Sequence, residues 1–294
     1  MVLLLSALEQ GMIYAIMALG VYITYKILDF PDLTVDGSFP MGAAITAVMI
    51  SRDMNPLLTL PVSFGAGVLV GICTGLIHVK LKVRDLLSGI IMMTGLYSIN
   101  LAVAGRANLP IYNKTTIFEN DFVKKYCPAF LEDFDKVIII AVIMLISKYL
   151  LDWYLRTKSG MMLRAVGDND RLVTSLHVDK GFVKIVGLAV ANGLVSLGGC
   201  IFAQQQRYFD VSMGTGTVVI GLASVIIGTS LFRKVTVLRV TSSVVIGSVI
   251  YKGCVALAIS LGLPSTYMKV VTAVLFLLIL VLGTERKRKV KVNA

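Results

Sequence analysis

Charged side chains are scarce in this 294-residue sequence. Only 15% of its residues are Asp, Glu, Lys or Arg, whereas 56% are hydrophobic and the mean hydropathy is +0.84. A soluble globular chain carries about 25% charged residues, which keep its surface in solution. Here the charges gather in short stretches between long apolar runs. The scarcity argues against an ordinary soluble domain and predicts an integral membrane protein.

The residues that usually build catalytic and metal sites are also few. The two histidines, His78 and His177, stand in no metal or nucleophile motif. Three of the four cysteines, Cys73, Cys200 and Cys254, lie inside apolar runs, so no disulfide framework or metal-ligand spacing can be assembled. We therefore expect no catalytic residue and no metal site, and a membrane enzyme is disfavoured.

Two further motifs are missing. The sequence has no Gly-x-x-x-x-Gly-Lys-Ser/Thr stretch, so it cannot cradle ATP phosphates by that route. The first apolar run, Met1 to Ile27, has no basic region before it and no convincing cleavage site after it. We interpret it as a membrane span rather than a signal peptide, and expect any ATP hydrolysis to occur on another chain.

Apolar runs of about 20 residues, the length that spans a bilayer, recur along the chain. They predict an all-α, polytopic transmembrane helical bundle in one domain, residues 1–294, with about eight or nine spans. The predicted spans lie near residues 2–28, 57–79, 86–104, 137–155, 182–204, 215–231, 240–260 and 267–283. The segment 38–51 is apolar but short, which predicts a discontinuous helix near 29–51.

Lys and Arg are concentrated in connections that would all lie on one side of the membrane. Most of the net charge of +11 sits in the loop 156–181 and in the tail 284–294. Cytoplasmic loops carry such an excess, so we expect a cytoplasmic C-terminus in a bacterial plasma membrane, with a tail that meets anionic lipid rather than nucleic acid. The side of the N-terminus depends on whether 38–51 crosses.

The break at 29–37 is one candidate for the solute pathway. Thr34 and Asp36 lie there with Asp32, in an otherwise apolar neighbourhood where acidic groups are costly. The break can line a solute path, or it can lie at the interface with Asp36 capping the following helix. Both interpretations stay open for Asp36.

Other polar residues inside spans are candidates of the same kind. Thr94, Ser98 and Asn100 lie on one predicted span, and Gln204 ends another. Neutral hydroxyls and amides can bind a small solute transiently, or they can hold helices together. These four residues complete the predicted solute pathway.

The loop 156–181 is long for a connection between helices. Its middle, 160–177, predicts a short helix in which Met161, Leu163 and Ala165 can pack, broken at Gly167 and restarted with a cap at Asp168 or Asn169. Such a helix suits docking to a soluble partner, whereas a solvated connection is the simpler alternative.

Three stretches of the sequence resemble a known family. They are Pro31 to Ser38, Met92 to Asn100, and the loop pattern Thr157, Gly160, Arg164, Ala165, Gly167, Asn169 and His177-Val178. Together they resemble permeases of the branched-chain amino acid and ribose importer superfamily, and within it a subgroup of ABC permeases associated with aromatic amino acids. The loop departs from the common pattern at Leu172 to Ser175, where small alanines are frequent.

The resemblance implies a transport subunit that is not an enzyme. It implies a homodimer that works with two cytoplasmic ATPase subunits, which hold ATP and Mg, and with an extracellular or lipoprotein solute-binding protein. It also implies an ATPase-coupling loop, made of Gly160, Arg164, Ala165, Gly167, Asp168, Asn169 and Asp170. The transported solute would be a small molecule such as an amino acid, by subgroup an aromatic one.

An ion-coupled secondary transporter is the main alternative, because such proteins also use broken helices and sites at the middle of the membrane. Ion coupling usually leaves several ionisable groups deep in the bundle. Beyond Glu9 and the acids at 29–36, the predicted spans offer few of them, and the long basic loop has no obvious purpose in that mechanism.

Overall fold

The computed structural model describes residues 2–119, 134–168, 179–232, 238–262, 270–274 and 276–277. Two predicted coupling-loop residues, Asn169 and Asp170, lie outside these residues, as do the basic tail and most of the predicted span 267–283.

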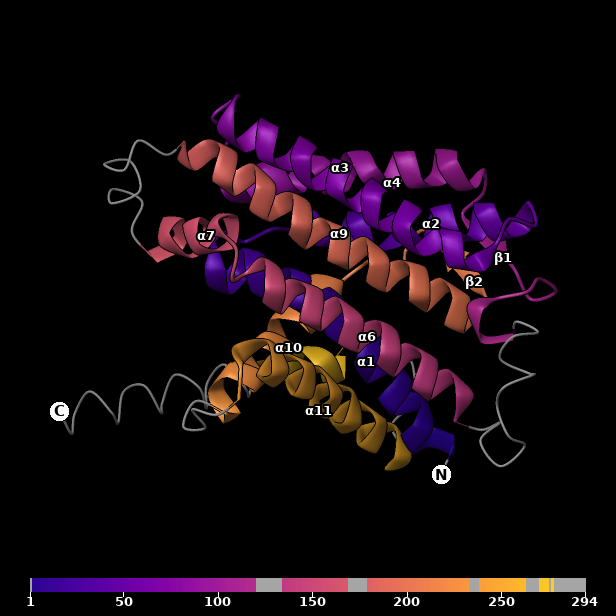
Figure 1. The fold of residues 1–294 in the computed structure, drawn as a ribbon. Coiled ribbons are helices and arrows are strands. Elements are labelled where there is room, and N and C mark those ends of the chain that lie inside the picture. Colours follow the sequence, from indigo (N-terminus) through magenta and orange to yellow (C-terminus); the bar gives the residue numbers. More distant parts are fainter. Residues whose placement is uncertain are drawn as a thin grey trace.

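The described part of the chain is a helical bundle with one small sheet, which confirms the predicted fold class (Figure 1). Its long helices are α1 (Val2–Tyr22), α3 (Thr59–Val79), α4 (Asp85–Ala104), α6 (Asp135–Tyr154), α9 (Lys180–Gln206) and α11 (Val240–Ser260). Its shorter elements are η1 (Ile23–Ile27), α2 (Val35–Ser51), η2 (Pro56–Leu58), η3 (Ile117–Glu119), α7 (Lys158–Asp168) and α10 (Thr217–Leu231). The strands β1 (Asn108–Pro110) and β2 (Tyr208–Asp210) pair antiparallel, with Leu109 opposite Phe209.

Six helical segments within the described residues are long and apolar enough to cross a membrane. They are Leu5–Ile27, Pro56–Val79, Asp85–Ala104, Asp135–Tyr154, Lys180–Gln206 and Val240–Ser260. The helices α2 and α10 are shorter, about 25 Å and 22 Å at the rise of an α-helix, against a hydrocarbon core of about 30 Å. The two short helices therefore need other residues to complete their crossings.

The chain is interrupted where the sequence predicts a discontinuous helix. The helix α1 runs into the π-helix η1, and residues 28–34 then carry the chain to the start of α2 at Val35. Asp29 has a left-handed backbone with φ of 52°. The break is thus shorter than the polar stretch 29–37, because Asp36 and Gly37 already belong to the first turn of α2.

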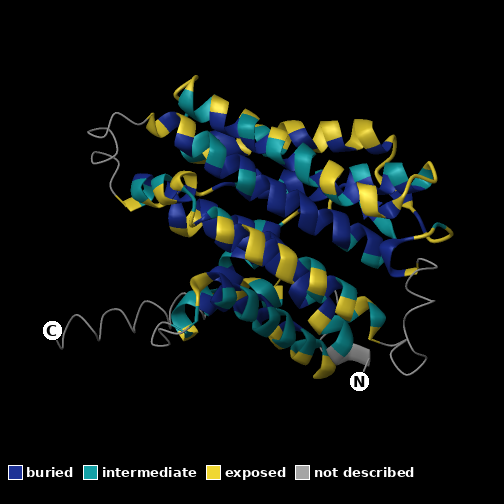
Figure 2. Cartoon of the chain, in the orientation of Figure 1, coloured by how far each residue is buried: buried dark blue, intermediate teal, exposed yellow. Residues whose placement is uncertain are grey.

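The helices α1 and α9 form the centre of the bundle. Figure 2 shows both as largely buried. The helices α2 and α3 pack against α9, α4 packs against α2 and α3, and α10 and α11 pack against α1. Glycines allow the closest of these approaches: a Cβ on Gly71 of α3 would lie 2.2 Å from the carbonyl oxygen of Leu188 in α9. Small residues permit such contact where lipid provides no hydrophobic drive to association.

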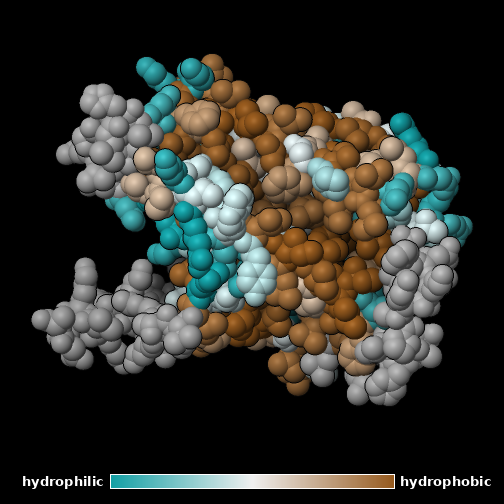
Figure 3. Space-filling view, viewed as in Figure 1, coloured by the Kyte–Doolittle hydropathy of each residue, from teal (hydrophilic) through white to brown (hydrophobic). Residues whose placement is uncertain are grey.

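The outer surface of the bundle is apolar in the middle and polar at its two ends. Figure 3 shows hydrophobic side chains over the middle of this face and hydrophilic ones toward both ends. The helices α4 and α6 expose large apolar residues such as Ile91, Leu150 and Trp153. This distribution is typical of a bundle whose middle lies in lipid.

The two polar ends differ in structure, and we name them by what they carry. The α7 end holds α7, η1 and the start of α9, where Asp179 caps the helix by accepting hydrogen bonds from the backbone N–H groups of Gly181 and Phe182. The sheet end holds β1 and β2. There α4 ends at the left-handed Gly105, and α9 ends at the left-handed Arg207, which turns the chain into β2.

Candidate functional site

The helix α7 lies across the α7 end with one face packed on the bundle. Its buried residues are Gly160, Leu163 and Val166, whereas Arg164 and Asp168 are exposed. Successive buried residues are three positions apart, which places them on one face of the helix. The exposed face is therefore available to a soluble partner.

The prediction for this helix was wrong in three respects: its first residue, the break at Gly167 and the packing of Met161. The helix begins at Lys158 rather than near Gly160, and it continues through Gly167 instead of breaking there. Met161 is 55% exposed and does not pack, whereas Leu163 is fully buried and Ala165 is partly buried. Gly167 instead permits close contact with η1, because a Cβ at this position would lie 1.6 Å from the carbonyl oxygen of Ile27.

Two glycines therefore set how closely α7 approaches its neighbours. Gly167 lies against the last residue of η1, and a Cβ at Gly160 would lie 2.4 Å from the carbonyl oxygen of Tyr154 in α6. Any side chain at either position would push α7 away from the bundle. The two glycines thus keep α7 in direct contact with η1 before the break and with the end of α6.

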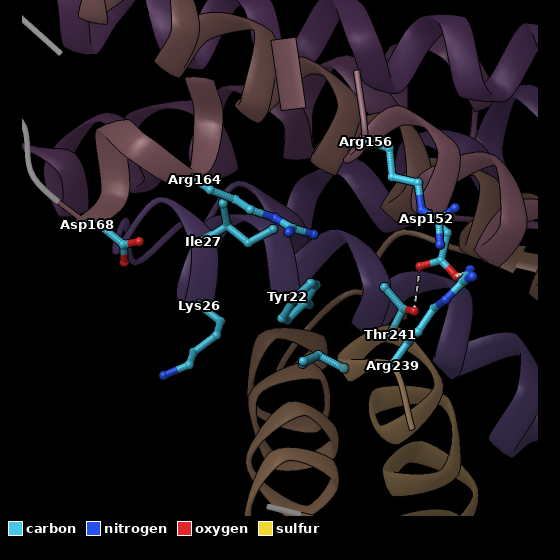
Figure 4. A pocket seen from close by; sticks show the side chains of 10 residues that line it. Tyr22, Lys26, Ile27, Asp152, Arg156, Arg164, Asp168, Arg239 and Thr241 are labelled. Carbon is cyan, nitrogen blue, oxygen red and sulfur yellow. Dashed lines mark hydrogen bonds and ion pairs between the residues drawn. The ribbon is translucent and has the colours of Figure 1, made fainter. Parts of the chain in front are cut away.

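A cavity of about 490 Å³ lies behind α7 (Figure 4). The ends of several helices line it with ten residues: Tyr22, Lys26, Ile27, Asp152, Arg156, Arg164, Asp168, Arg239, Val240 and Thr241. In Figure 4 the Arg164 side chain extends over the cavity toward Tyr22, while Arg156 and Arg239 converge on Asp152. Four cations and two acids make the cavity positively charged.

Asp152 is the fixed point of this cavity. Its carboxylate accepts hydrogen bonds from Arg239 at 3.0 Å and from the Thr241 hydroxyl at 2.6 Å, and Lys148 lies 3.7 Å away. Asp152 is buried, and a buried carboxylate persists only when it is paired and hydrogen-bonded. The contacts join α6 to the start of α11, on the side of the cavity opposite α7.

The break itself is organised by Asp32. Its carboxylate accepts hydrogen bonds from the backbone N–H of Thr34 and from the Asn192 side chain, both at 2.9 Å. Asn192 in turn accepts from the Ser38 hydroxyl at 2.6 Å, and the hydroxyls of Thr34 and Thr74 lie 3.1 Å apart. All five side chains are buried, so this network attaches the break to α9 and α3.

Asp36 lies in α2, and its carboxylate caps a different helix, α10. Its carboxylate accepts hydrogen bonds from the backbone N–H groups of Gly216 and Val218 and from the Thr217 hydroxyl, at 2.9–3.0 Å. These groups begin α10, where the N–H groups have no partner within the helix and the helix dipole favours an anion. The starts of α2 and α10 therefore meet at one carboxylate.

The other predicted pathway residues do not come together. Thr94 and Ser98 lie on the exposed face of α4, where the Thr94 hydroxyl donates to the backbone of Ile90. Asn100 is buried and donates to the carbonyl oxygen of Gly37 in α2, at 3.0 Å. In this single chain α4 therefore presents Thr94 and Ser98 outward and Asn100 inward.

Gln204 holds helices and loops together at the sheet end. Its side chain accepts from the backbone N–H of Ile117 at 3.0 Å and donates to the Thr59 hydroxyl at 2.9 Å. It is buried, with 1% of its surface exposed. Both halves of its amide are thus used between segments of the chain.

A group of polar residues near the sheet end was missed by the sequence reasoning. Lys252 of α11 lies over the ring of Tyr14, beside Gln10, and Glu9 accepts a hydrogen bond from Gln205. A single lysine in the middle of the apolar run 240–260 was the signal that could have identified it.

A second cavity, of about 380 Å³, opens at the sheet end. It is lined by Asn108, Tyr112, Tyr208, Asp210, Ser212 and Met213. Burial opposes ionisation of Asp210, but hydrogen bonds from Ser212 and Asn108 outweigh it and hold the pKa of this carboxyl below its usual value. The cavity therefore presents two phenol rings and a stabilised carboxylate.

Comparisons with known proteins agree with this architecture. Residues 3–280 match the family described as "Branched-chain amino acid transport system / permease component". The chain is 40% identical over 291 residues to a "Tyrosine transport system permease protein" of Clostridioides difficile, covering 99% of this chain and 95% of the relative. It is 23% identical over 290 residues to the "Ribose import permease protein RbsC" of Escherichia coli K12, covering 97% and 86%.

A further relative is named as a branched-chain amino acid permease. The chain is 25% identical over 225 residues to a "Probable branched-chain amino acid transport permease protein LivH" of Methanocaldococcus jannaschii, covering 72% of this chain and 70% of the relative. No solved structure matches the chain. The match over residues 3–280 and the 40% identity show that this chain belongs to the family of branched-chain amino acid transport system permease components.

Proposed function

We propose that this transport permease is the membrane subunit of an ATP-binding-cassette importer, and that it moves an amino acid with an aromatic side chain into the cell. The proposed partners are a second copy of the chain, cytoplasmic ATPase subunits that bind ATP and Mg, and an extracellular or lipoprotein solute-binding protein. The α7 end and the C-terminus would then face the cytoplasm of a bacterial cell.

The observation that carries this proposal is the position of α7. The helix is seated on the bundle through Leu163, Val166 and the glycine contact at Gly167, with Arg164 exposed. A soluble ATPase that gripped this helix would move η1, which leads directly into the break before α2. A helix in this place supports mechanical coupling and has no evident use in a transporter that works alone.

The choice of solute is supported by the relatives. The relative with 40% identity is named as a tyrosine permease, whereas the ribose permease shares 23%. A higher identity over nearly the whole of both chains favours the amino-acid class, because transport specificity resides in particular side chains rather than in the fold.

The test is to purify the chain alone and with its partner ATPase, and to reconstitute the complex with its solute-binding protein in vesicles. We expect ATP hydrolysis only in the complex, and ATP-dependent uptake of L-[3H]tyrosine. Arg164→Ala should reduce uptake about tenfold, since it removes a charge-assisted contact to the ATPase. Lys80→Ala, an exposed cation at the same end but outside the cavity, is the control and should retain uptake.

A different result would contradict the importer mechanism. If no ATPase associates with the chain, and if uptake follows an ion gradient without ATP, the chain is a secondary transporter. The buried acids Glu9 and Asp32 would then be the first residues to examine as ion sites.

A further inference from the structure

A lysine inside a membrane span has no acidic partner in the part of the chain that the structure describes. Lys252 lies twelve residues into α11, about 18 Å along the helix. Its ammonium is 3.8 Å from the centre of the Tyr14 ring and 3.4 Å from the Gln10 side-chain oxygen. Among the carboxylates that the structure describes, none forms an ion pair with it.

Lys148 provides a comparison within the same molecule. It also lies in a span and over a tyrosine ring, with its ammonium 4.5 Å from the centre of Tyr149. Unlike Lys252, it has a carboxylate partner, Asp152, at 3.7 Å. Ionisable residues in spans usually pair or face a solute path, and Lys148 takes the first course.

The neighbourhood of Lys252 contains an acid that is separate from it. Glu9 precedes Gln10 on α1, is buried, and accepts a hydrogen bond from Gln205 of α9 at 2.9 Å. Gln205 accepts in turn from Gln206 at 2.7 Å. Lys252 and Glu9 therefore each contact a neutral amide, Gln10 and Gln205 respectively, and form no ion pair with each other.

Aromatic rings adjoin these charges. The rings of Tyr14 and Phe202 lie edge to face with centroids 5.7 Å apart, and Phe39 stacks on Tyr14 at 5.7 Å. Lys252, Gln10 and Phe202 are only partly buried, so the group retains some accessible surface.

We propose that Lys252 binds the α-carboxylate of an amino acid as it passes through the permease, while Glu9 faces its ammonium group. The inference rests on the proposed function and specifies its substrate class as a zwitterionic α-amino acid. The aromatic rings beside Lys252 would pack against its side chain. A ribose molecule carries neither charge and would leave both groups unused, which distinguishes this chain from its sugar-transporting relative.

The experiment uses the full complex with ATPase and solute-binding protein in vesicles, with L-[3H]tyrosine as the probe. Lys252→Met keeps the length of the side chain but removes its charge, and we expect uptake to fall at least about tenfold, as for loss of a hydrogen bond to a charged group. Lys252→Arg restores the charge and should recover uptake to within about threefold of wild type. Glu9→Gln should reduce uptake less than Lys252→Met, since the hydrogen bond from Gln205 remains.

Two controls separate solute binding from folding and coupling. Lys148→Met removes the other span lysine and should keep uptake within about threefold, because Asp152 retains Arg239 and Thr241. ATP hydrolysis stimulated by the loaded binding protein should stay within about twofold of wild type in Lys252→Met, which shows that the complex assembles and couples.

The outcomes separate this inference from the proposed function. Wild-type uptake driven by ATP, with Lys252→Met equally active, overturns the inference and leaves the importer intact. Gradient-driven uptake that is lost in Lys252→Met and recovered in Lys252→Arg overturns the importer mechanism and supports the inference. A wild-type complex that imports ribose but not L-tyrosine overturns the inference and the amino-acid class together.

Discussion

The two ends of the bundle treat buried charge in different ways. At the α7 end, Asp152 accepts hydrogen bonds from Arg239 and Thr241 and lies beside Lys148, so this buried acid has several partners within the protein. Toward the sheet end, Lys252 contacts an amide oxygen and an aromatic ring, and no carboxylate among the described residues pairs with it. A buried charge with ionic partners stabilises the fold. A charge without one remains able to bind a charged group of a solute.

The break in the middle connects the two ends. Asp36, on the helix that runs to the sheet end, caps α10, which runs to the α7 end. One carboxylate therefore links the segment after the break to the start of α10. The predictions below test each part of this comparison, beginning with the largest expected effect.

Gly167→Ala should nearly abolish ATP-driven uptake. The new Cβ would overlap the carbonyl oxygen of Ile27 and displace α7 from its seat. We expect at least about a thirtyfold loss, measured as L-[3H]tyrosine uptake by the reconstituted complex. The control is Gly65→Ala, where the added Cβ meets no atom within 4 Å and uptake should be unchanged. Equal uptake in both variants would show that the seat of α7 is not needed for coupling.

Asp152→Asn should destabilise the α7 end strongly, and Lys252→Met should hardly affect stability. Loss of the carboxylate leaves Arg239 and Lys148 without their shared anion, at a cost of about 2–4 kcal/mol. Lys252 forms no ion pair with any described residue, so its replacement should change the free energy of unfolding by less than about 1 kcal/mol. Thermal unfolding of both variants in one detergent gives the comparison, and a larger effect of Lys252→Met would reverse it.

Asp36→Asn should lower stability by an intermediate amount. The substitution replaces one carboxylate oxygen with an amide NH₂, which cannot accept a hydrogen bond from a backbone N–H at the start of α10. We expect the free energy of unfolding to fall by about 1–2 kcal/mol. Hydrogen exchange should report the loss first in the opening turn of α10. If protection is lost equally along α2 and α10, the carboxylate supports the whole junction rather than the cap.

The smallest effect concerns pH at the sheet end. Because the folded-state pKa of Asp210 is lowered, its charged form stabilises the fold above the usual pKa of about 4, and this contribution is lost as the pH falls below it. The test compares unfolding temperatures at pH 6 and pH 3. Acidification should lower the unfolding temperature of the wild type slightly more than that of Asp210→Asn. Identical losses would mean that Ser212 and Asn108 do not stabilise the ionised form.

Several features could be predicted from the sequence because they depend on local composition. The apolar runs gave the spans, the polar stretch at 29–37 gave the interruption, and the loop pattern from Gly160 gave a helix at the α7 end. The end of that helix was wrong because Gly167 was interpreted as a helix breaker, whereas it accommodates a close contact with η1. A glycine that permits contact and one that ends a helix look the same in a single sequence.

The roles of the polar residues could not be predicted in the same way. The spans are apolar nearly all round, so no amphipathic stripe indicates which face meets a neighbouring helix. Thr94 and Ser98 looked equivalent to Asn100 in sequence, yet only Asn100 faces α2. Lys252 was overlooked because its contacts, Gln10 and Tyr14, lie more than two hundred positions away in the chain.

By itself, the sequence determined that this is a helical membrane protein with a broken helix, since span length and apolar runs are local properties. Only the tertiary structure decided that Asp36 caps α10 and that Lys252 lies beside Gln10 and Tyr14, with no carboxylate of the described residues paired to it. These arrangements arise when helices distant in sequence pack through glycine contacts and buried hydrogen bonds. Their geometry exists only once the bundle has assembled.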